Sequence, residues 1–221
     1  MTDPYTQPRP GSAALVLIDV QRDFYADDAP LPIEGTKTAI PAMARLTSEF
    51  RDRALPIVHV VRLYRCDGSN VELCNRASIE EGQRIVMPGS LGAELIDELK
   101  ADPSLRLDSS LLLDGKLQTV GPHEWIMYKP RWSAFYQTGL EAHLRGLGIT
   151  TLVIAGANFS NGPQATVYAA SNRDFRIVLA TDAISGASEA TLGELARMGV
   201  YLMSSEQCLA WLSREGEVVA A

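Results

Sequence analysis

Short apolar runs recur along the chain, and each is followed by a stretch with helical periodicity. The runs do not alternate apolar with polar residues, and turn-forming residues bound them, which is typical of strands buried on both faces of a sheet. Six such runs are present: Ala13–Ile18, Ile57–Leu63, Trp125–Tyr128, Thr151–Ala155, Arg176–Ala180 and Val200–Met203.

Helices are expected between these strands. Ser90 is a plausible N-cap for the second helix, and Gly148 is a plausible C-cap for the third. The expected helices are Ala39–Ala54, Leu91–Leu99, Leu140–Leu147, Gln164–Arg173, Ala190–Arg197 and Glu206–Ser213. Alternating strands and helices predict an α/β fold with three layers, α/β/α, around a central parallel sheet of about six strands joined by right-handed crossovers.

The length of 221 residues suits one domain. We expect this domain to span 13–214, between a flexible N-terminal arm, 1–12, and a C-terminal tail, 215–221. Two connections, Tyr64–Pro88 and Asp102–Pro122, are long for a compact domain, and such loops are usually functional or mobile. The second contains Ser110–Leu113, which could add a short strand.

Composition limits the partners of the chain. The net charge of −7 and the pI near 5.0 argue against nucleic acid or an anionic membrane as the main partner. No apolar stretch reaches about 18 residues, and the N-terminus lacks the apolar core of a signal peptide. Three cysteines, an odd number, suit a reducing compartment. The expectation is a cytoplasmic protein.

Polar side chains follow the strands at the edge where an open α/β sheet binds ligands. Asp19 follows the first apolar run, as either a general acid or base or a turn aspartate. Lys129 follows another run, where it would hold Asp19 ionised, share a proton with it, or form an ordinary salt bridge. The glycine- and asparagine-rich turn 156–162 precedes a helix whose backbone N–H groups favour an anion or an oxyanion, although its glycines also suit a positive φ.

Three of these segments together resemble the isochorismatase-like (cysteine) hydrolase superfamily. They read LIDVQRDF, KPRWSAFYQTGLEAHLRGLGITTLVIAG and DFRIVLATDAIS, in that order, and the similarity runs from about Ala14 to about Leu212. The resemblance implies that Asp19 and Lys129 are the catalytic aspartate and lysine. It places the nucleophilic cysteine of the superfamily at Gly162.

Glycine at that position closes the covalent route, because amide hydrolysis of this kind needs a thiolate to form an acyl-enzyme. The other cysteines, Cys66, Cys74 and Cys208, lie elsewhere, and Ser160 is expected to point away. The resemblance to true isochorismatases implies a reaction without a nucleophile, in which an aspartate protonates a vinyl ether and water attacks the resulting cation. Acid–base chemistry of this type, by Asp19 tuned by Lys129, is our first hypothesis.

A second hypothesis is an inactive amidohydrolase scaffold, as a pseudoenzyme, a ligand-binding protein or a chain whose nucleophile was removed. It rests on GSNVELCNRASIEEG and GANFSNGP, which are more similar to the amidohydrolase branch than to the isochorismatases. A third is a binding or assembly role as an oligomer. The expected partners are a small-molecule substrate and further copies of the chain, in a dimer or tetramer.

Other residues near the strand ends are candidates for substrate or oxyanion binding. Arg62, Tyr64 and Arg65 would bind a carboxylate or ureido group or else cap a loop. Phe24, Trp132, Phe135 and Tyr136 would line a pocket for a planar substrate or belong to the core. The candidates are Phe24, Arg62, Tyr64, Trp132, Phe135, Asn158, Phe159 and Asn161. His59 lies inside an apolar run, so we expect a packed histidine there, with no metal and no cofactor.

Overall fold

The computed structural model describes residues 3–26 and 28–216. Within them, seven strands form one sheet in the order β3-β4-β2-β1-β5-β6-β7. All neighbouring strands are parallel except β3 and β4, which are antiparallel. The strands are β1 Ala13–Ile18, β2 Ile57–Val61, β3 Gln118–Gly121, β4 Glu124–Tyr128, β5 Thr151–Gly156, β6 Arg176–Ile184 and β7 Tyr201–Met203.

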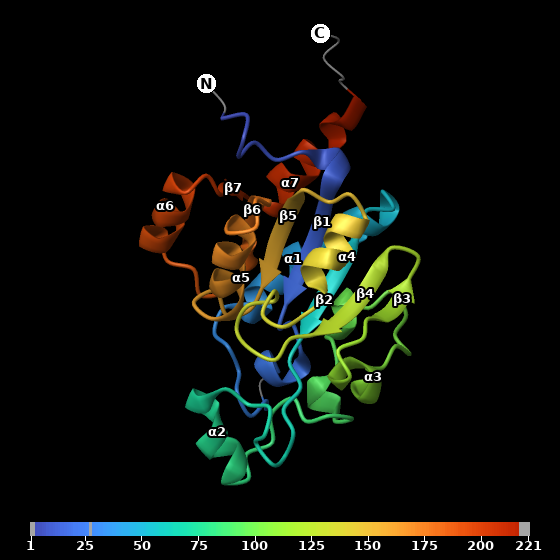
Figure 1. The fold of residues 1–221 in the computed structure, drawn as a ribbon, viewed down its shortest axis with the longest axis vertical. Coiled ribbons are helices and arrows are strands. Elements are labelled where there is room, and N and C mark those ends of the chain that lie inside the picture. Colours follow the sequence, from blue (N-terminus) through green and yellow to red (C-terminus); the bar gives the residue numbers. More distant parts are fainter. Residues whose placement is uncertain (1–2, 27, 217–221) are drawn as a thin grey trace.

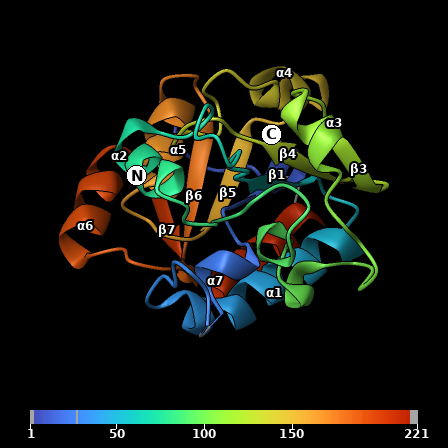
Figure 2. The same cartoon turned by 90° about the horizontal axis from the view of Figure 1, so that it is seen from below.

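Helices cover both faces of this sheet, so the three-layer prediction is confirmed (Figures 1 and 2). One face packs against α4 and α5 and the other against α1 and α7. The helices are α1 Thr36–Asp52, α2 Leu73–Glu80, α3 Ser109–Leu113, α4 Leu140–Gly146, α5 Gly162–Ser171, α6 Glu189–Arg197 and α7 Ser205–Leu212.

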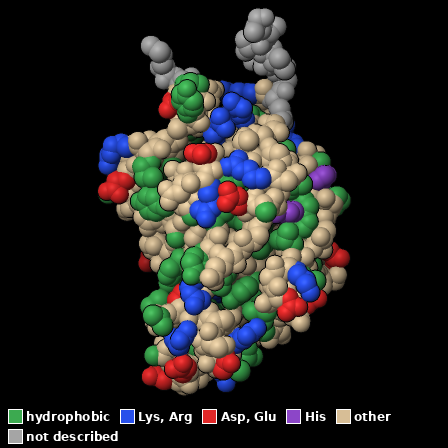
Figure 3. Space-filling model, in the orientation of Figure 1, with side chains coloured by type: hydrophobic (Ala, Val, Ile, Leu, Met, Phe, Trp, Pro, Cys, Tyr) green, Lys and Arg blue, Asp and Glu red, His purple; other side chains and the backbone are tan. Residues whose placement is uncertain are grey.

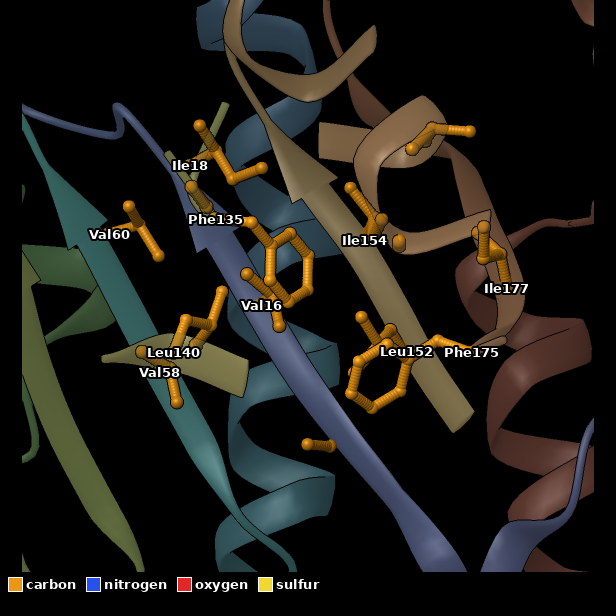
Figure 4. Close-up of a cluster of buried hydrophobic side chains, with 14 of the residues drawn as sticks. Val16, Ile18, Val58, Val60, Phe135, Leu140, Leu152, Ile154, Phe175 and Ile177 are labelled. Carbon is orange, nitrogen blue, oxygen red and sulfur yellow. The ribbon is translucent and has the colours of Figure 1, made fainter. Parts of the chain in front are cut away.

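The central strand β1 explains why its sequence is apolar throughout. It is hydrogen-bonded to β2 on one side and to β5 on the other, and all six of its residues are buried. Ala14, Val16 and Ile18 face the core beneath α4 and α5, where Figure 4 shows Val16 and Ile18. The alternate residues face the core beneath α1 and α7. A strand buried on both faces needs no polar alternation.

The strands were predicted better than the connections between them. The six predicted strands are all present, but β3 was missed, because Ser110–Leu113 belongs to helix α3 and the extra strand lies after it. The predicted helix Leu91–Leu99 is wrong: two 3₁₀ turns, Leu91–Ala93 and Asp97–Leu99, stand there instead. Ser90 does cap the first of these turns, accepting a hydrogen bond from Ala93. Helix α2 was also missed.

The segment before β1 is attached to the sheet. The backbone N–H of Arg9 donates to Oγ1 of Thr151, and Pro10–Ser12 form a 3₁₀ turn. At the other end, a 3₁₀ turn over Ser213–Gly216 follows α7. Most of the predicted tail, 217–221, lies outside the described residues. Among the described residues no helix has the length and apolarity to cross a membrane. Acidic and basic side chains are intermixed on the face shown in Figure 3.

Candidate active site

Asp19 and Lys129 meet at the carboxyl edge of the sheet. Each directly follows a strand, and backbone N–H groups anchor both: Asp19 donates to the Val60 carbonyl and Lys129 to the Val61 carbonyl. Nζ of Lys129 lies 2.7 Å from Oδ2 of Asp19, and the lysine side chain is fully buried. Asp19 has a φ of 55°, a left-handed conformation that aspartate tolerates better than most residues. Its Oδ1 has no hydrogen-bond partner among the described residues.

The surroundings of Lys129 favour loss of its proton. The pKa of Lys129 is lowered from 10.5 to about 8, chiefly by burial; Asp19 opposes this by attracting the protonated amine, and the positive charge of Arg62 adds to the lowering. A lysine with this pKa is mostly charged at neutral pH and titrates just above it. It therefore supplies a positive charge beside Asp19 that alkaline pH removes.

Gly162 is the first residue of α5 and lies against this pair. A Cβ atom at this position would come 2.9 Å from Oδ2 of Asp19 and 3.3 Å from Nζ of Lys129. The carbonyl of Gly162 accepts a hydrogen bond from Thr166, whose hydroxyl oxygen in turn accepts one from the backbone of Ala134. Thr166 thus holds the Gly162 carbonyl, and a side chain at this position would require the end of the Asp19 side chain to shift.

The turn before α5 commits several of its backbone N–H groups to the protein. Ala157 donates to the Ile18 carbonyl, Phe159 to the Ser185 carbonyl and Asn161 to the Asn158 carbonyl. These three N–H groups are therefore not available to a ligand. Ser160 is exposed, and its hydroxyl donates to Oδ1 of Asn158.

A cavity of about 240 Å³ opens beside Asp19. Residues predicted from the sequence supply most of its lining, namely the carboxylate of Asp19 and the binding candidates Phe24, Arg62, Tyr64, Trp132, Asn158 and Asn161. Sequence reasoning missed four lining residues, Leu31, Ile33, Asn75 and Ala157. Three of these lie in irregular connections or in the unpredicted helix α2, where no periodic pattern marks a position as facing the cavity.

The structure does not bring Phe135 and Phe159 to this cavity. Both are buried in the core beneath α4 and α5, and the Phe135 ring lies 5.7 Å from that of Phe175 (Figure 4). The hydrogen bond from Ala134 to Thr166 fixes the backbone before Phe135, and that from Phe159 to Ser185 holds the second residue. Phe135 therefore belongs to the core, the alternative that its sequence position also allowed, and Phe159, predicted as a binding residue, lies in the same core.

Arg62 lies in the cavity wall, with 2% of its side chain exposed. It forms an ion pair with Glu72, which precedes α2, and its guanidinium carbon lies 5.2 Å from the centre of the Trp132 ring. The Tyr64 hydroxyl donates to Oε2 of Glu72 over 2.7 Å. Burial raises the pKa of Tyr64, so this hydroxyl keeps its proton and remains a donor.

Two residues of the LIDVQRDF segment hold the loops around the cavity. The buried side chain of Gln21 donates to the carbonyls of Arg62 and Ala93 and accepts from the Arg62 backbone. Oδ2 of Asp23 accepts a hydrogen bond from Val86, which lies at the end of the long connection after β2. This motif therefore fixes the framework of the site as well as supplying Asp19.

His59 lies in β2, away from the cavity, and is packed as expected. Its Nε2 lies 2.6 Å from Oε1 of Glu124, and Arg51 from α1 holds the same carboxylate through two nitrogen atoms. Burial raises the pKa of Glu124, but hydrogen bonds from Arg51 and His59 outweigh it and lower the value from 4.5 to about 2. No group of three or more potential metal ligands occurs in residues 3–26 and 28–216.

The sequence of this chain is similar to those of several known proteins. The family model described as the isochorismatase domain matches residues 13–108 and 113–207. A probable inactive nicotinamidase from Arabidopsis thaliana is 31% identical over 179 residues, covering 80% of this chain and 82% of that protein. The phenazine biosynthesis protein PhzD1 of Pseudomonas aeruginosa is 29% identical over 177 residues, covering 73% of this chain and 84% of that protein.

A solved structure has the same fold over nearly the whole chain. It is that of an isochorismatase family protein from Desulfovibrio vulgaris, with a TM-score of 0.75 and 27% sequence identity. The superposition covers 95% of this chain and 99% of the other.

Proposed function

The chain belongs to the isochorismatase family, and from that premise we propose that it is a small-molecule hydrolase that works by acid–base chemistry at Asp19 and Lys129 without a covalent intermediate. The observation that carries this proposal is the buried ion pair at the cavity. Asp19 keeps one oxygen without a partner among the described residues, while Lys129 holds the other at 2.7 Å. Gly162 has no side chain to attack a carbonyl, so the nucleophilic role is vacant at the position where the resemblance places it.

Hydrolysis of a vinyl ether suits this arrangement. The reacting form of Asp19 is the one that has taken up a proton from solvent on Oδ1, the oxygen that Lys129 does not hold. This acid transfers its proton to the vinylic carbon, which leaves a positive charge shared between the neighbouring carbon and the ether oxygen. Water adds to that carbon and gives up a proton to the Asp19 carboxylate. The hemiketal that results then breaks its bond to the ether oxygen while its hydroxyl proton passes to that oxygen, which releases a ketone and an alcohol. Atoms balance with one water consumed, and Asp19 ends protonated as it began.

Lys129 assists by charge. Asp19 becomes a carboxylate when it gives up its proton, and the ammonium group on its other oxygen stabilises that carboxylate in a buried environment. The same charge stabilises the carboxylate while it waits for the proton of the attacking water. This role uses Lys129 in its protonated form.

A second candidate, an inactive amidohydrolase scaffold that binds its ligand without turnover, is favoured by one specific comparison. The relative from Arabidopsis thaliana is named a probable inactive nicotinamidase. On this interpretation Gly162 marks the lost nucleophile, and the cavity beside Asp19 retains ligand binding.

One experiment separates the two candidates. The protein is assayed in D₂O against a panel of vinyl ethers and, separately, against amides and N-carbamoyl compounds, together with Asp19→Asn and Gly162→Cys. The first candidate predicts a ketone with one deuterium on the former vinylic carbon, formed by the unaltered protein and not by D19N. Amide hydrolysis gained only in G162C, with no vinyl-ether turnover by the unaltered protein, supports the second candidate and contradicts the first.

A further inference from the structure

The charged groups at the cavity are already paired within the protein. Two charged side chains line it, Asp19 and Arg62. Each has a buried partner of opposite sign: Lys129 for Asp19, fully buried, and Glu72 for Arg62, with 4% of its side chain exposed. The two pairs sum to zero charge. A ligand that carried its own charge into this cavity would have no unpaired countercharge to meet.

Glu72 is held where it neutralises Arg62. Besides the ion pair, its Oε2 accepts the hydroxyl hydrogen of Tyr64, and that hydroxyl oxygen accepts a hydrogen bond from Asn75. Glu72 immediately precedes α2, and Asn75 lies in the first turn of that helix, so the carboxylate and the cavity wall share one rigid element. Displacing Glu72 from Arg62 would leave a buried carboxylate without its charge partner, which is costly.

The rest of the lining suits an uncharged planar molecule. Phe24 and Trp132 supply aromatic surface, and the side-chain amides of Asn75, Asn158 and Asn161 supply donors and acceptors without net charge. Arg62 also has Nη2 without a hydrogen-bond partner among the described residues. This nitrogen is buried, so a neutral carbonyl or ether oxygen would have to enter beside Arg62 to accept its hydrogen.

We propose that Glu72 is a specificity-determining residue that makes the cavity accept uncharged planar ligands and reject carboxylates. This inference rests on the proposed function only in taking the cavity beside Asp19 as the ligand site. It predicts that removing the charge of Glu72 frees one positive charge at Arg62 and reverses the preference of the cavity.

Benzamide and benzoate test this proposal, because the two probes have nearly the same shape and differ in charge. Their dissociation constants are measured by calorimetry on the full chain, at a pH where benzoate is ionised. The unaltered protein is expected to bind benzamide at least roughly tenfold more tightly than benzoate. In Glu72→Gln the ratio should reverse in favour of benzoate.

Two further variants separate charge from structure. Tyr64→Phe removes a hydrogen bond to Glu72 without changing any charge, so the preference for benzamide should remain. The double variant R62M/E72Q removes both members of the pair and restores a charge sum of zero, so it should again prefer benzamide. If E72Q fails to fold because Arg62 is left unpaired, the double variant replaces it in the test. A preference for benzoate in the unaltered protein or in the double variant would overturn the proposal.

Ligand binding and turnover are measured separately, so failure of one proposal can be distinguished from failure of the other. A protein that hydrolyses no vinyl ether but shows the benzamide preference and its reversal supports the role of Glu72 and contradicts the proposed function. If the protein hydrolyses vinyl ethers but E72Q leaves the ratio of the benzamide and benzoate dissociation constants unchanged, the proposed function is supported and the role of Glu72 is contradicted.

Discussion

Nζ of Lys129 and Oδ2 of Asp19 lie 2.7 Å apart at the point where the backbone of α5 begins. The pair lies so close to Gly162 that a Cβ atom there would meet the carboxylate at 2.9 Å. The ion pair therefore fills the space beside the start of α5, and it can do so because Gly162 has no side chain.

Asp19→Asn should abolish turnover, because the amide cannot deliver a proton to the substrate. A single general acid contributes roughly 10²- to 10⁴-fold to the rate, so kcat should fall by at least about 100-fold. Turnover at the unaltered rate in D19N would sink the mechanism.

Turnover should also fall as pH rises through about 8. Burial lowers the pKa of Lys129 to about 8, so the ammonium that stabilises the Asp19 carboxylate is present below this pH and lost above it. Well above pH 8 the rate should drop by about tenfold for each pH unit. In Lys129→Arg the charge persists to much higher pH, so the alkaline limb should disappear even if the rate is lower. If K129R keeps the fall in rate at high pH, that fall is caused by the titration of another group.

Gly162→Ala should impair the site through packing alone. The added methyl group would press on the carboxylate of Asp19, and overpacking of this kind costs about 1–3 kcal/mol. A small displacement of the acid should lower kcat by roughly 10- to 100-fold. Gly146→Ala is the matched control, because a Cβ atom at that helical glycine would meet nothing within 4 Å. Thermal unfolding and kcat are measured for both, and equal effects would contradict the packing argument.

Glu124→Gln should destabilise the fold without changing ligand affinity. Arg51 then faces an amide in place of a buried carboxylate, which should lower the free energy of unfolding by about 3 kcal/mol. The folded pKa of Glu124 is depressed from 4.5 to about 2, so its stabilising contribution is present above pH 4.5 and is lost as pH falls towards 2.

Urea unfolding between pH 2 and 7 checks this expectation. The difference between the unaltered protein and E124Q should shrink as the pH falls. Glu141→Gln provides the comparison, because its pair with Arg173 is exposed and should contribute less than about 1 kcal/mol. A difference that stays constant down to pH 2 would be inconsistent with the lowered pKa.

The sequence predicted the strands because their burial on both faces leaves a simple signal. Runs such as Ala13–Ile18 are apolar without interruption, and the boundaries of β1 agree with the prediction at both ends. The positions of Asp19 and Lys129 followed from the same runs, because residues directly after parallel strands gather at one edge of the sheet. The structure shows that these two residues are indeed in contact.

The connections between the strands and several residues of the cavity could not be predicted, because they depend on contacts between distant segments that leave no local pattern in the sequence. A helix was expected over Leu91–Leu99, yet Ile96 and Leu99 are buried in the core beneath α1 at a single 3₁₀ turn, Asp97–Leu99. Glu72 looked like one charged residue in a polar loop, and its role became visible only when the fold placed it against Arg62. Phe135 was compatible with a pocket wall and with the core, and Phe159 was expected among the binding residues of its turn, but packing against distant segments places both in the core.

The position of β1 in the middle of the sheet has a consequence for how the chain acquires its structure. Ser12 and Thr150, 138 residues apart, are joined by a hydrogen bond at the start of the β1–β5 pairing. During synthesis, β1 therefore leaves the ribosome long before its second neighbour exists, and one edge of an entirely apolar strand stays unpaired. Chains truncated before Thr151 should remain sensitive to protease, and resistance should rise abruptly once β5 has been made.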